Sequence, residues 1–460
     1  MSTAESAGMR TFFIVWIGQL ISVVGSNLTG FGLAVWMYLE TDSVTLLALI
    51  MLASTLPGIV LSPIAGALVD RWDRRKVMLT SDTCAGIATF VVALLFFTNG
   101  LELWHIYVMA TIGSVANSFQ EPAYTASVPL LVPKKHLGRA NGLVQMGQAI
   151  GTLVAPVLAG VLVASTGLWG VLLADGATFI VAVTTLALVR IPRPAAVPSR
   201  ATHVWAEVVE GWQWLRVRGG LFGFMLITAG VNFLLGFMSV LYIPLYLSFA
   251  DEVVLGTAMS VLGVGMLVGS LAMGLWGGPK RRMRGIVVGI GLGGLLVATM
   301  GLDDSVFLVT GAGFWLMATV AIVNGTSQAL WQVKVPPELQ GRAFSVRRML
   351  AQMAIPIAYL SAGPLADGVF EPLLAVGGGL AGSVGTAIGT GPGRGIGFMF
   401  VLMGLGTVIL AAVAYAKPSI RNLEVELPDM IPDQPMADEL TRLPPREGEE
   451  GQVSPSVMGS

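Results

Sequence analysis

Cysteine and histidine are nearly missing from this chain of 460 residues, which contains one cysteine, Cys84, and three histidines. A single cysteine excludes an intramolecular disulfide and gives no information about the redox state of the compartment. The histidines, His105, His136 and His203, are scattered along the chain, so no zinc site can be built from them. The sequence therefore predicts no metal and no cofactor.

Charged residues are also scarce, at 12% of the chain, whereas 54% of the residues are apolar and the mean hydropathy is +0.77. A soluble protein of this length could not bury so much apolar surface. Apolar runs long enough to cross a bilayer of roughly 30 Å recur from end to end. The net charge of −1 gives no information about partners, and we expect no nucleic acid among them.

Twelve apolar runs predict an all-α integral membrane protein with twelve transmembrane helices. The runs fall approximately at 12–38, 44–69, 77–97, 104–131, 140–164, 168–189, 221–247, 253–276, 285–301, 306–333, 343–366 and 395–416. Six precede a polar linker and six follow it. We therefore expect a six-helix half at 1–190, a cytoplasmic linker at 191–220, a second six-helix half at 221–416 and a cytoplasmic tail at 417–460.

Three segments lie outside these runs. In the linker, Trp205, Val208 and Trp212 fall at helical spacing, which favours a helix lying on the membrane surface over a solvated helix. The tail has nine acidic and four basic residues and little apolar content, which predicts disorder. The stretch 373–394 is rich in glycine and alanine, and it is either a long loop or a re-entrant segment.

The stretch from Gly66 to Lys76 indicates the orientation of the chain. It carries four basic residues between the second and third runs, and such loops stay on the cytoplasmic side. With a cytoplasmic N-terminus, 25 of the 26 lysines and arginines fall on the inner side, and only Arg394 falls outside. We expect both termini in the cytoplasm and a multi-pass protein of the inner or plasma membrane. The glycine cluster at 289–294 follows no strand, so it predicts no nucleotide site and no enzyme.

The two halves repeat. Pro133 and the sequence Gly-Arg-Ala at 138–140 recur as Pro336 and Gly-Arg-Ala at 341–343, an offset of 203 residues (336 − 133). The stretch 66–76 also recurs after the eighth run, where its acid is lost. Two duplicated six-helix halves with a substrate site between them are typical of secondary transporters.

The stretch 66–76 resembles the signature of the major facilitator superfamily, Gly-x-Leu-Ala-Asp-Arg-x-Gly-Arg-Lys, and the resemblance extends over residues 10–416. The matching residues are Gly66, Leu68, Asp70, Arg71, Arg74 and Arg75. The chain departs from the signature at Asp73, where the family has glycine. The resemblance implies that Gly66, Asp70, Arg71, Arg74 and Arg75 form a cytoplasmic latch that holds the two halves together in one state. The alternative is that this loop only sets the topology.

The fifth run resembles the antiporter signature Gly-x-x-x-Gly-Pro-x-x-Gly-Gly. The signature residues present are Gly151, Ala155, Pro156 and Gly160, and alanine replaces two glycines. The resemblance implies a role in the direction of transport, whereas ordinary packing of membrane helices is the alternative. Residues 370–372 and 391–395 are similar to the macrolide-efflux-like, or enterobactin-exporter-like, branch of the drug:proton antiporters.

Polar side chains at helical spacing within the apolar runs are candidates for a substrate cavity. They are Gln19, Ser22 and Ser26 on the first run, Asn117 on the fourth, Asn232 on the seventh, and Asn324, Gln328 and Trp331 on the tenth. The first, fourth and tenth helices line the cavity in the superfamily that the chain resembles. For the serines, hydrogen bonding between helices is the alternative.

Three acids lie inside the runs. Asp82 is about one turn from the cytoplasmic end of the third run, within reach of the basic loop, which predicts a structural role; Asp175 lies near the outer end of the sixth. Glu121 lies nearest the middle of its run, where an ionised carboxylate is costly, so it is the candidate for proton coupling. Pro122 follows it directly, and a local structural role is the alternative.

These observations predict a secondary active exporter of a bulky amphipathic compound, such as a drug, a macrolide or a siderophore-like metabolite. We expect proton antiport and alternating access within the lipid bilayer. One alternative is an importer or a lipid-flipping facilitator of the same fold. Another is a membrane receptor or scaffold that transports nothing.

Overall fold

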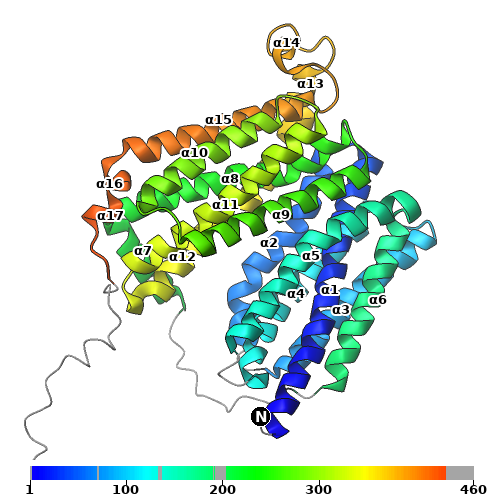
Figure 1. Cartoon of the computed structure of the whole chain (residues 1–460). Coiled ribbons are helices and arrows are strands. Elements are labelled where there is room, and N and C mark those ends of the chain that lie inside the picture. The colour runs from blue at the N-terminus through cyan, green and yellow to red at the C-terminus, as the bar shows by residue number, and fades with distance from the viewer. Residues whose placement is uncertain (1–2, 70–71, 133–136, 190, 192–203, 431–460) are drawn as a thin grey trace, which may run out of the picture.

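The computed structural model describes residues 3–69, 72–132, 137–189, 191 and 204–430 (Figure 1). Within these residues the chain is helical, without strands. The twelve helices of 19 or more residues are α1 (Thr3–Thr41), α2 (Val44–Val69), α3 (Arg74–Phe97), α4 (Leu103–Leu131), α5 (Leu137–Thr166), α6 (Leu168–Leu188), α8 (Gly219–Leu247), α9 (Glu252–Trp276), α10 (Arg282–Met300), α11 (Val306–Lys334), α12 (Pro337–Leu365) and α15 (Arg394–Ala416). The shorter elements are α7 (Val204–Val217), the π-helix η2 (Ala366–Phe370), α13 (Glu371–Leu374), α14 (Gly385–Ile388), α16 (Pro418–Arg421) and α17 (Leu423–Glu426).

Eleven helices in the described part of the chain are long and apolar enough to cross a membrane. They include every long helix except α4, so the structure shows eleven candidate spans where the sequence predicted twelve. The difference arises from the polar residues in the middle of α4, which lower its hydropathy. These residues are Ser114, Asn117, Ser118, Gln120 and Glu121.

The same packing pattern occurs in both halves of the chain (Figure 1). In the first half α1 packs against α5 and α6, α2 against α4, and α3 against α4 and α6. In the second half α8 packs against α12 and α15, α9 against α11, and α10 against α11 and α15. The halves meet where α5 packs on α9 and α2 packs on α12. Under this correspondence α2 matches α9 and α5 matches α12, so the two contacts are equivalent.

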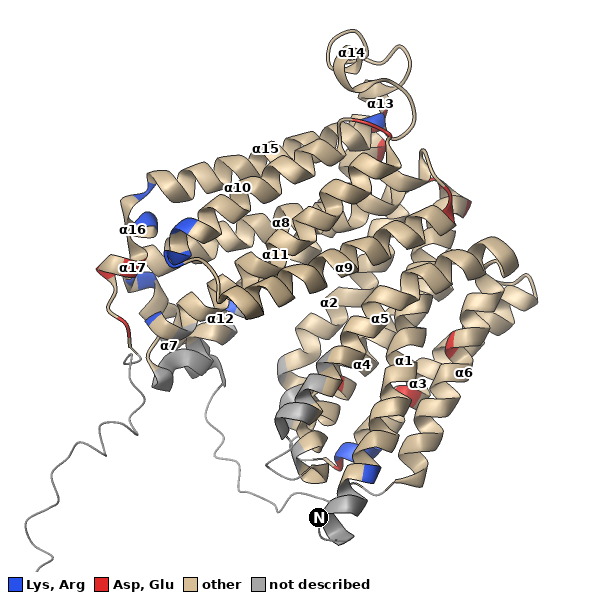
Figure 2. Ribbon diagram, viewed as in Figure 1, with Lys and Arg blue, Asp and Glu red and all other residues tan. Residues whose placement is uncertain are grey.

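The buried apolar side chains form one shared core and two separate ones. The largest cluster joins both halves, and it includes Met37 of α1 and Tyr246 of α8. A second cluster, around Met78, belongs to the first half alone, and a third, around Trp331, belongs to the second half alone. The two separate cores lie at the helix ends that carry most of the lysines and arginines, here called the basic end (Figure 2). The shared core lies toward the opposite end.

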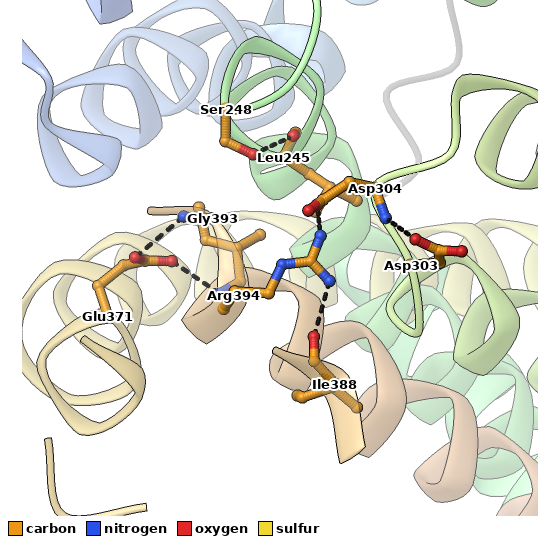
Figure 3. A network of polar contacts seen from close by, with 9 residues as sticks. Leu245, Ser248, Asp303, Asp304, Glu371, Ile388, Gly393 and Arg394 are labelled. Atoms are coloured by element: carbon orange, nitrogen blue, oxygen red, sulfur yellow. Dashed lines mark hydrogen bonds and ion pairs between the residues drawn. The ribbon is translucent and has the colours of Figure 1, made fainter. Parts of the chain in front are cut away.

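The stretch 373–394 is a loop that projects from the opposite end (Figure 1), and not a re-entrant segment. The buried side chain of Arg394 organises this loop. Its Nη1 donates to the carbonyl oxygen of Ile388 at 2.8 Å, and its Nη2 pairs with Asp304 (Figure 3). Nearby, the carboxylate of Glu371 accepts hydrogen bonds from main-chain amides at the start of α15. These contacts explain how one arginine is accommodated at the opposite end.

The first residues of the tail are ordered, so the prediction of disorder was wrong for them. Ile420 and Leu423 are almost completely buried against the second half. The carboxylate of Glu424 accepts hydrogen bonds of 2.9 and 3.1 Å from the first two amides of α10. Two apolar side chains and one helix-capping acid therefore dock a segment whose overall composition is polar. Residues 431–460 of the tail and 192–203 of the linker lie outside the described residues.

Candidate functional site

The exposed side chains of α4 change character along the helix. Toward the opposite end they are apolar, as at Trp104 and Ile112, whereas toward the basic end they are polar. The polar stripe of α4 consists of Asn117, Glu121 and Thr125, at steps of four residues and on a different face from Ile112. Because an ionisable side chain facing lipid is costly, this stripe is suited to water and the apolar face to lipid.

Helix α11 shows the same change. Trp315 is exposed toward the opposite end, and Asn324 and Gln328 are exposed toward the basic end. Asn324 and Gln328 lie 203 residues after Glu121 and Thr125, which is the offset of the sequence repeat. The repeat therefore places two equivalent polar stripes, one in each half, at the end of the molecule where the halves have separate cores.

The predicted cavity residues fall into three groups. Exposed side chains are Ser26, Asn117, Asn324 and Gln328. The side chain of Asn232 is half-buried. Buried side chains are Gln19, Ser22 and Trp331. The structure therefore places the amides of α4 and α11 on the polar stripes, and it places two of the three residues of α1 inside the packed first half.

Arg347 of α12 was missed by sequence reasoning. Its guanidinium donates to Gln328 Oε1 and to Ser327 Oγ, both at 3.2 Å, and lies 5.0 Å from the centre of the Trp331 ring. This contact covers Trp331 and places a cation beside the polar stripe of α11. Its position in the sequence was the available signal. Arg347 lies ten residues after Pro337, where α12 begins, and so it belongs to the interior of a long helix and not to a loop.

Asp82 contacts none of the described arginines of the basic loop, so the prediction that it reaches them was wrong. Its carboxylate is 4% exposed and accepts a hydrogen bond of 3.0 Å from Gln19 Nε2. Gln19 Oε1 in turn accepts a hydrogen bond of 2.7 Å from Gln120 Nε2. Asp82 lies eight residues into α3, about 12 Å from its start. Arg74 and Arg75 of the loop donate instead to main-chain carbonyls of α4 and α6.

Part of the predicted cytoplasmic latch can be placed. Asp70 and Arg71 lie outside the described residues, and Gly66 belongs to the last turn of α2. Arg74 donates to a main-chain carbonyl of α4 at 2.6 Å, and Arg75 to two carbonyls of α6 at 2.9 and 2.7 Å. Asp73, the departure from the signature, is the N-cap of α3. These contacts all lie within the first half.

At the opposite end, Asp367 of η2 joins the two halves. Its carboxylate accepts hydrogen bonds from Ser43 Oγ at 3.0 Å, from the Val44 amide at 3.0 Å and from the Thr45 amide at 2.8 Å. A carboxylate at a helix N-terminus satisfies free amides and interacts favourably with the helix dipole. Gly363 lies against the same turn, since a Cβ added there would be 2.4 Å from Thr45 Cα.

The second contact between the halves contains the signature of the fifth run. Gly151, Ala155, Pro156 and Gly160 are all buried. A Cβ added at Gly160 would lie 2.5 Å from the carbonyl oxygen of Glu252, at the start of α9. A Cβ added at Gly256 of α9 would lie 2.4 Å from the carbonyl oxygen of Pro156. The small residues therefore let the backbones of α5 and α9 approach closely across the interface.

The family model described as Major Facilitator Superfamily matches residues 15–359 of the chain. The chain belongs to the major facilitator superfamily. As a member, it is a multi-pass membrane transporter of a small molecule and not an enzyme.

Two curated efflux proteins are similar to this transporter over most of their length. Macrolide efflux protein A of Streptococcus pyogenes is 28% identical over 361 residues, which cover 77% of this chain and 89% of that protein. The multidrug efflux pump Tap of Mycolicibacterium fortuitum is 24% identical over 433 residues, which cover 89% of this chain and 98% of that protein.

Solved structures of membrane transporters share the fold. A bacterial homologue of the human lysosomal transporter Spinster, in an inward-facing and unoccupied conformation, superposes with a TM-score of 0.66 at 14% identity, covering 90% of this chain and 96% of that one. A bacterial homologue of the iron transporter ferroportin, in an inward-facing state, gives a TM-score of 0.64 at 13% identity, covering 89% of this chain and 99% of that one.

Proposed function

We propose that this transporter is a secondary active exporter of bulky amphipathic compounds, driven by proton antiport. The similarity to a macrolide efflux protein and to a multidrug efflux pump supports the direction and the class of substrate. The basic end faces the cytoplasm of the cell, because it carries nearly all of the lysines and arginines that the structure describes (Figure 2). In this arrangement α4 also crosses the membrane and brings the number of spans to twelve. The two six-helix halves are pseudo-symmetric, and both termini are cytoplasmic.

The observation that carries this proposal is the distribution of contacts between the halves. They share a core and the Asp367 contact toward the opposite end, and they have separate cores at the basic end. The polar stripes of α4 and α11 are exposed at that basic end. This distribution supports a conformation in which an exporter takes up substrate from the cytoplasm, one of the two states that alternating access requires.

Glu121 is the proton-coupling group in this proposal. It is exposed on the polar stripe of α4, and its counterpart on α11 is the neutral Asn324. A single carboxylate that must enter a dry interface when the basic end closes is stabilised either by a proton or by a cationic substrate. Competition between proton and substrate for one carboxylate produces antiport.

The loop 66–76 is the cytoplasmic latch that forms when the basic end closes. In the conformation described here, Arg74 and Arg75 already anchor the start of α3 to α4 and α6. When the basic end closes, we expect Asp70 and Arg71 to contact the second half. The small residues of α5 are the surface on which α9 turns between states.

Dye transport tests the proposal. The transporter, expressed in a strain with low efflux, should lower the accumulation of ethidium and raise the tolerated dose of macrolides, and a protonophore should abolish both effects. Vesicles of known orientation then give the direction. Accumulation toward the cytoplasmic side would show an importer, and movement of labelled lipid alone would show a lipid facilitator. No flux of any probe, with normal insertion, would support a receptor or scaffold.

A further inference from the structure

We propose that Arg347 of α12 and Glu121 of α4 bind opposite ends of one substrate, so that this transporter prefers amphipathic zwitterions, compounds that carry both an amine cation and a carboxylate. The inference rests on the proposed export function and names its substrate class. It is carried by two charges of opposite sign, one in each half, that the sequence repeat does not duplicate.

The polar stripes of α4 and α11 line one space between the halves. Exchanging the halves turns the α5–α9 contact into the α2–α12 contact and the reverse, which is the property of a two-fold axis between them. Two equivalent stripes therefore both face this axis or both face away from it. Stripes that face away would expose Glu121, Asn324 and Gln328 to lipid, which is costly. The stripes therefore face the axis, at the end where the halves have separate cores.

The first half contributes a negative charge to this space. Glu121 is the only aspartate, glutamate, lysine or arginine in α4, and its side chain is exposed on the stripe. Its counterpart in the second half, at the offset of 203 residues, is the neutral Asn324. An amine cation therefore finds its partner on the first half alone.

The second half contributes a positive charge. Arg347 contacts the stripe of α11 through Gln328, and its counterpart at the same offset is the apolar Val144 of α5 (347 − 203 = 144). The only charged residue of α11 itself, Lys334, is buried and forms an ion pair of 2.7 Å with Asp429. Arg347 is therefore the cation that the second half presents beside the stripe.

The guanidinium of Arg347 is held in place without being neutralised. Its hydrogen bonds of 3.2 Å go to neutral acceptors, Gln328 Oε1 and Ser327 Oγ, and they use two of its five N–H groups. The completely buried Trp331 ring, 5.0 Å away, supports it. No carboxylate of the described side chains pairs with it. A positioned guanidinium with N–H groups to spare is suited to bind a carboxylate.

The two charges lie at different depths. Gln328 corresponds to Thr125, which lies four residues, or about 6 Å, closer to the basic end than Glu121. A zwitterion can therefore place its amine deep in the space at Glu121 and its carboxylate nearer the basic end at Arg347. A substrate with the amine alone leaves the guanidinium unpaired and is repelled by it, so the pair of charges selects against simple cations.

Binding to the purified full-length transporter in nanodiscs of phosphatidylcholine tests the inference without a pH gradient. The probes are a cationic rhodamine dye with a free carboxylate and its methyl ester, which differ only at the acid. The wild type should bind the free acid about 10-fold more tightly, the contribution of one hydrogen bond between charged groups. Arg347→Gln should abolish this preference by weakening the binding of the free acid alone, and Arg347→Lys should keep part of it.

Two further variants are the controls. Arg284→Gln removes an exposed basic residue of α10 at the same end of the molecule, and it should change neither affinity. Glu121→Gln should weaken the binding of both dyes by the same factor, because both carry the cation, and it should keep the preference for the free acid.

Equal affinities of the wild type for the two dyes would overturn the inference. Equal weakening of both dyes in Arg347→Gln would also overturn it, because a contact that only holds α12 to α11 gives that result. So would a preference that disappears when anionic lipid is added, since Arg347 would then hold a lipid headgroup. In proteoliposomes, efflux of both dyes driven by a pH gradient without preference would refute the substrate class and leave the export proposal standing. Preferential binding without gradient-driven efflux would refute the antiport and support the substrate class.

Discussion

Replacing Asp367 by asparagine should shift the transporter from the conformation described here toward one that is open at the opposite end. The three hydrogen bonds that Asp367 accepts from Ser43, Val44 and Thr45 are the polar contact that joins α2 to the second half. They cannot persist when these helix ends separate. The contact therefore stabilises one state of the transport cycle and is absent from the other.

The size of the shift follows from the contact. An N-cap interaction contributes about 1 kcal/mol, and a charge near a helix N-terminus adds about 0.3–1 kcal/mol. Asparagine keeps one acceptor oxygen, but its amino group faces main-chain donors and its charge is gone. Because Asp367 is partly exposed, we expect a net loss of about 1–2 kcal/mol, which changes the ratio of the two states by roughly 5- to 30-fold.

Distances between spin labels measure that ratio. The single native cysteine, Cys84, is exposed and can be replaced by serine. Thr98→Cys and Leu302→Cys place labels on exposed loops of the two halves at the opposite end. In Asp367→Asn the population with a long distance between these labels should grow. A second pair of labels at the basic end, Lys76→Cys and Arg284→Cys, should show the reverse change.

Asp251→Asn is the matched control. Asp251 also caps a helix, by accepting a hydrogen bond of 2.8 Å from the Val254 amide, but donor and acceptor belong to the same half. Its replacement should destabilise α9 locally and leave the distance distributions unchanged. Equal distributions in Asp367→Asn and the wild type, or equal shifts in Asp367→Asn and Asp251→Asn, would refute the reasoning.

Four further predictions concern single residues. Glu121→Gln should abolish efflux driven by a pH gradient while substrate exchange survives, because glutamine mimics the protonated acid. Gradient-driven efflux at the wild-type rate in proteoliposomes would remove Glu121 from the mechanism. Arg74→Ala should insert normally and transport several-fold more slowly, as dye efflux in whole cells will show, since it frees the start of α3. Gly160→Ala should lower the melting temperature and the transport rate because its Cβ would meet the backbone of α9, whereas Gly113→Ala, with no atom within 4 Å, should do neither. Glu424→Ala should cost about 1 kcal/mol of stability by uncapping α10, measurable in denaturant titrations as a lower midpoint.

The long helices could be predicted from the sequence because a backbone in lipid must satisfy its own hydrogen bonds over a fixed thickness. The predicted run at 395–416 and α15 (Arg394–Ala416) differ by one residue, and the predicted 140–164 lies within α5 (Leu137–Thr166). The docking of Leu423 against the second half was not predictable in this way. Composition averages over a segment, whereas docking depends on where two or three apolar side chains point.

The candidate site was predictable in residue type and less so in arrangement. The helical spacing of Asn324 and Gln328 on one span was visible, and these two share an exposed stripe. The partner of Asp82 was not visible, because the rotation of α1 against α3 decides whether Gln19 faces water or a buried acid. Arg347 was missed because the sequence allows it to be counted among the cytoplasmic basic residues, and such a count does not indicate a contact with α11.

The most direct test of the account is a simultaneous measurement of proton flux and ethidium flux in proteoliposomes that hold the wild-type transporter in one orientation. A pH gradient, acidic on the side of the opposite end, should drive ethidium from the basic end toward that acidic side against its own gradient. Protons should move the other way in fixed proportion, and collapsing the gradient should stop the uphill movement. Ethidium flux that is independent of the pH gradient, or protons moving with the dye, would contradict the account.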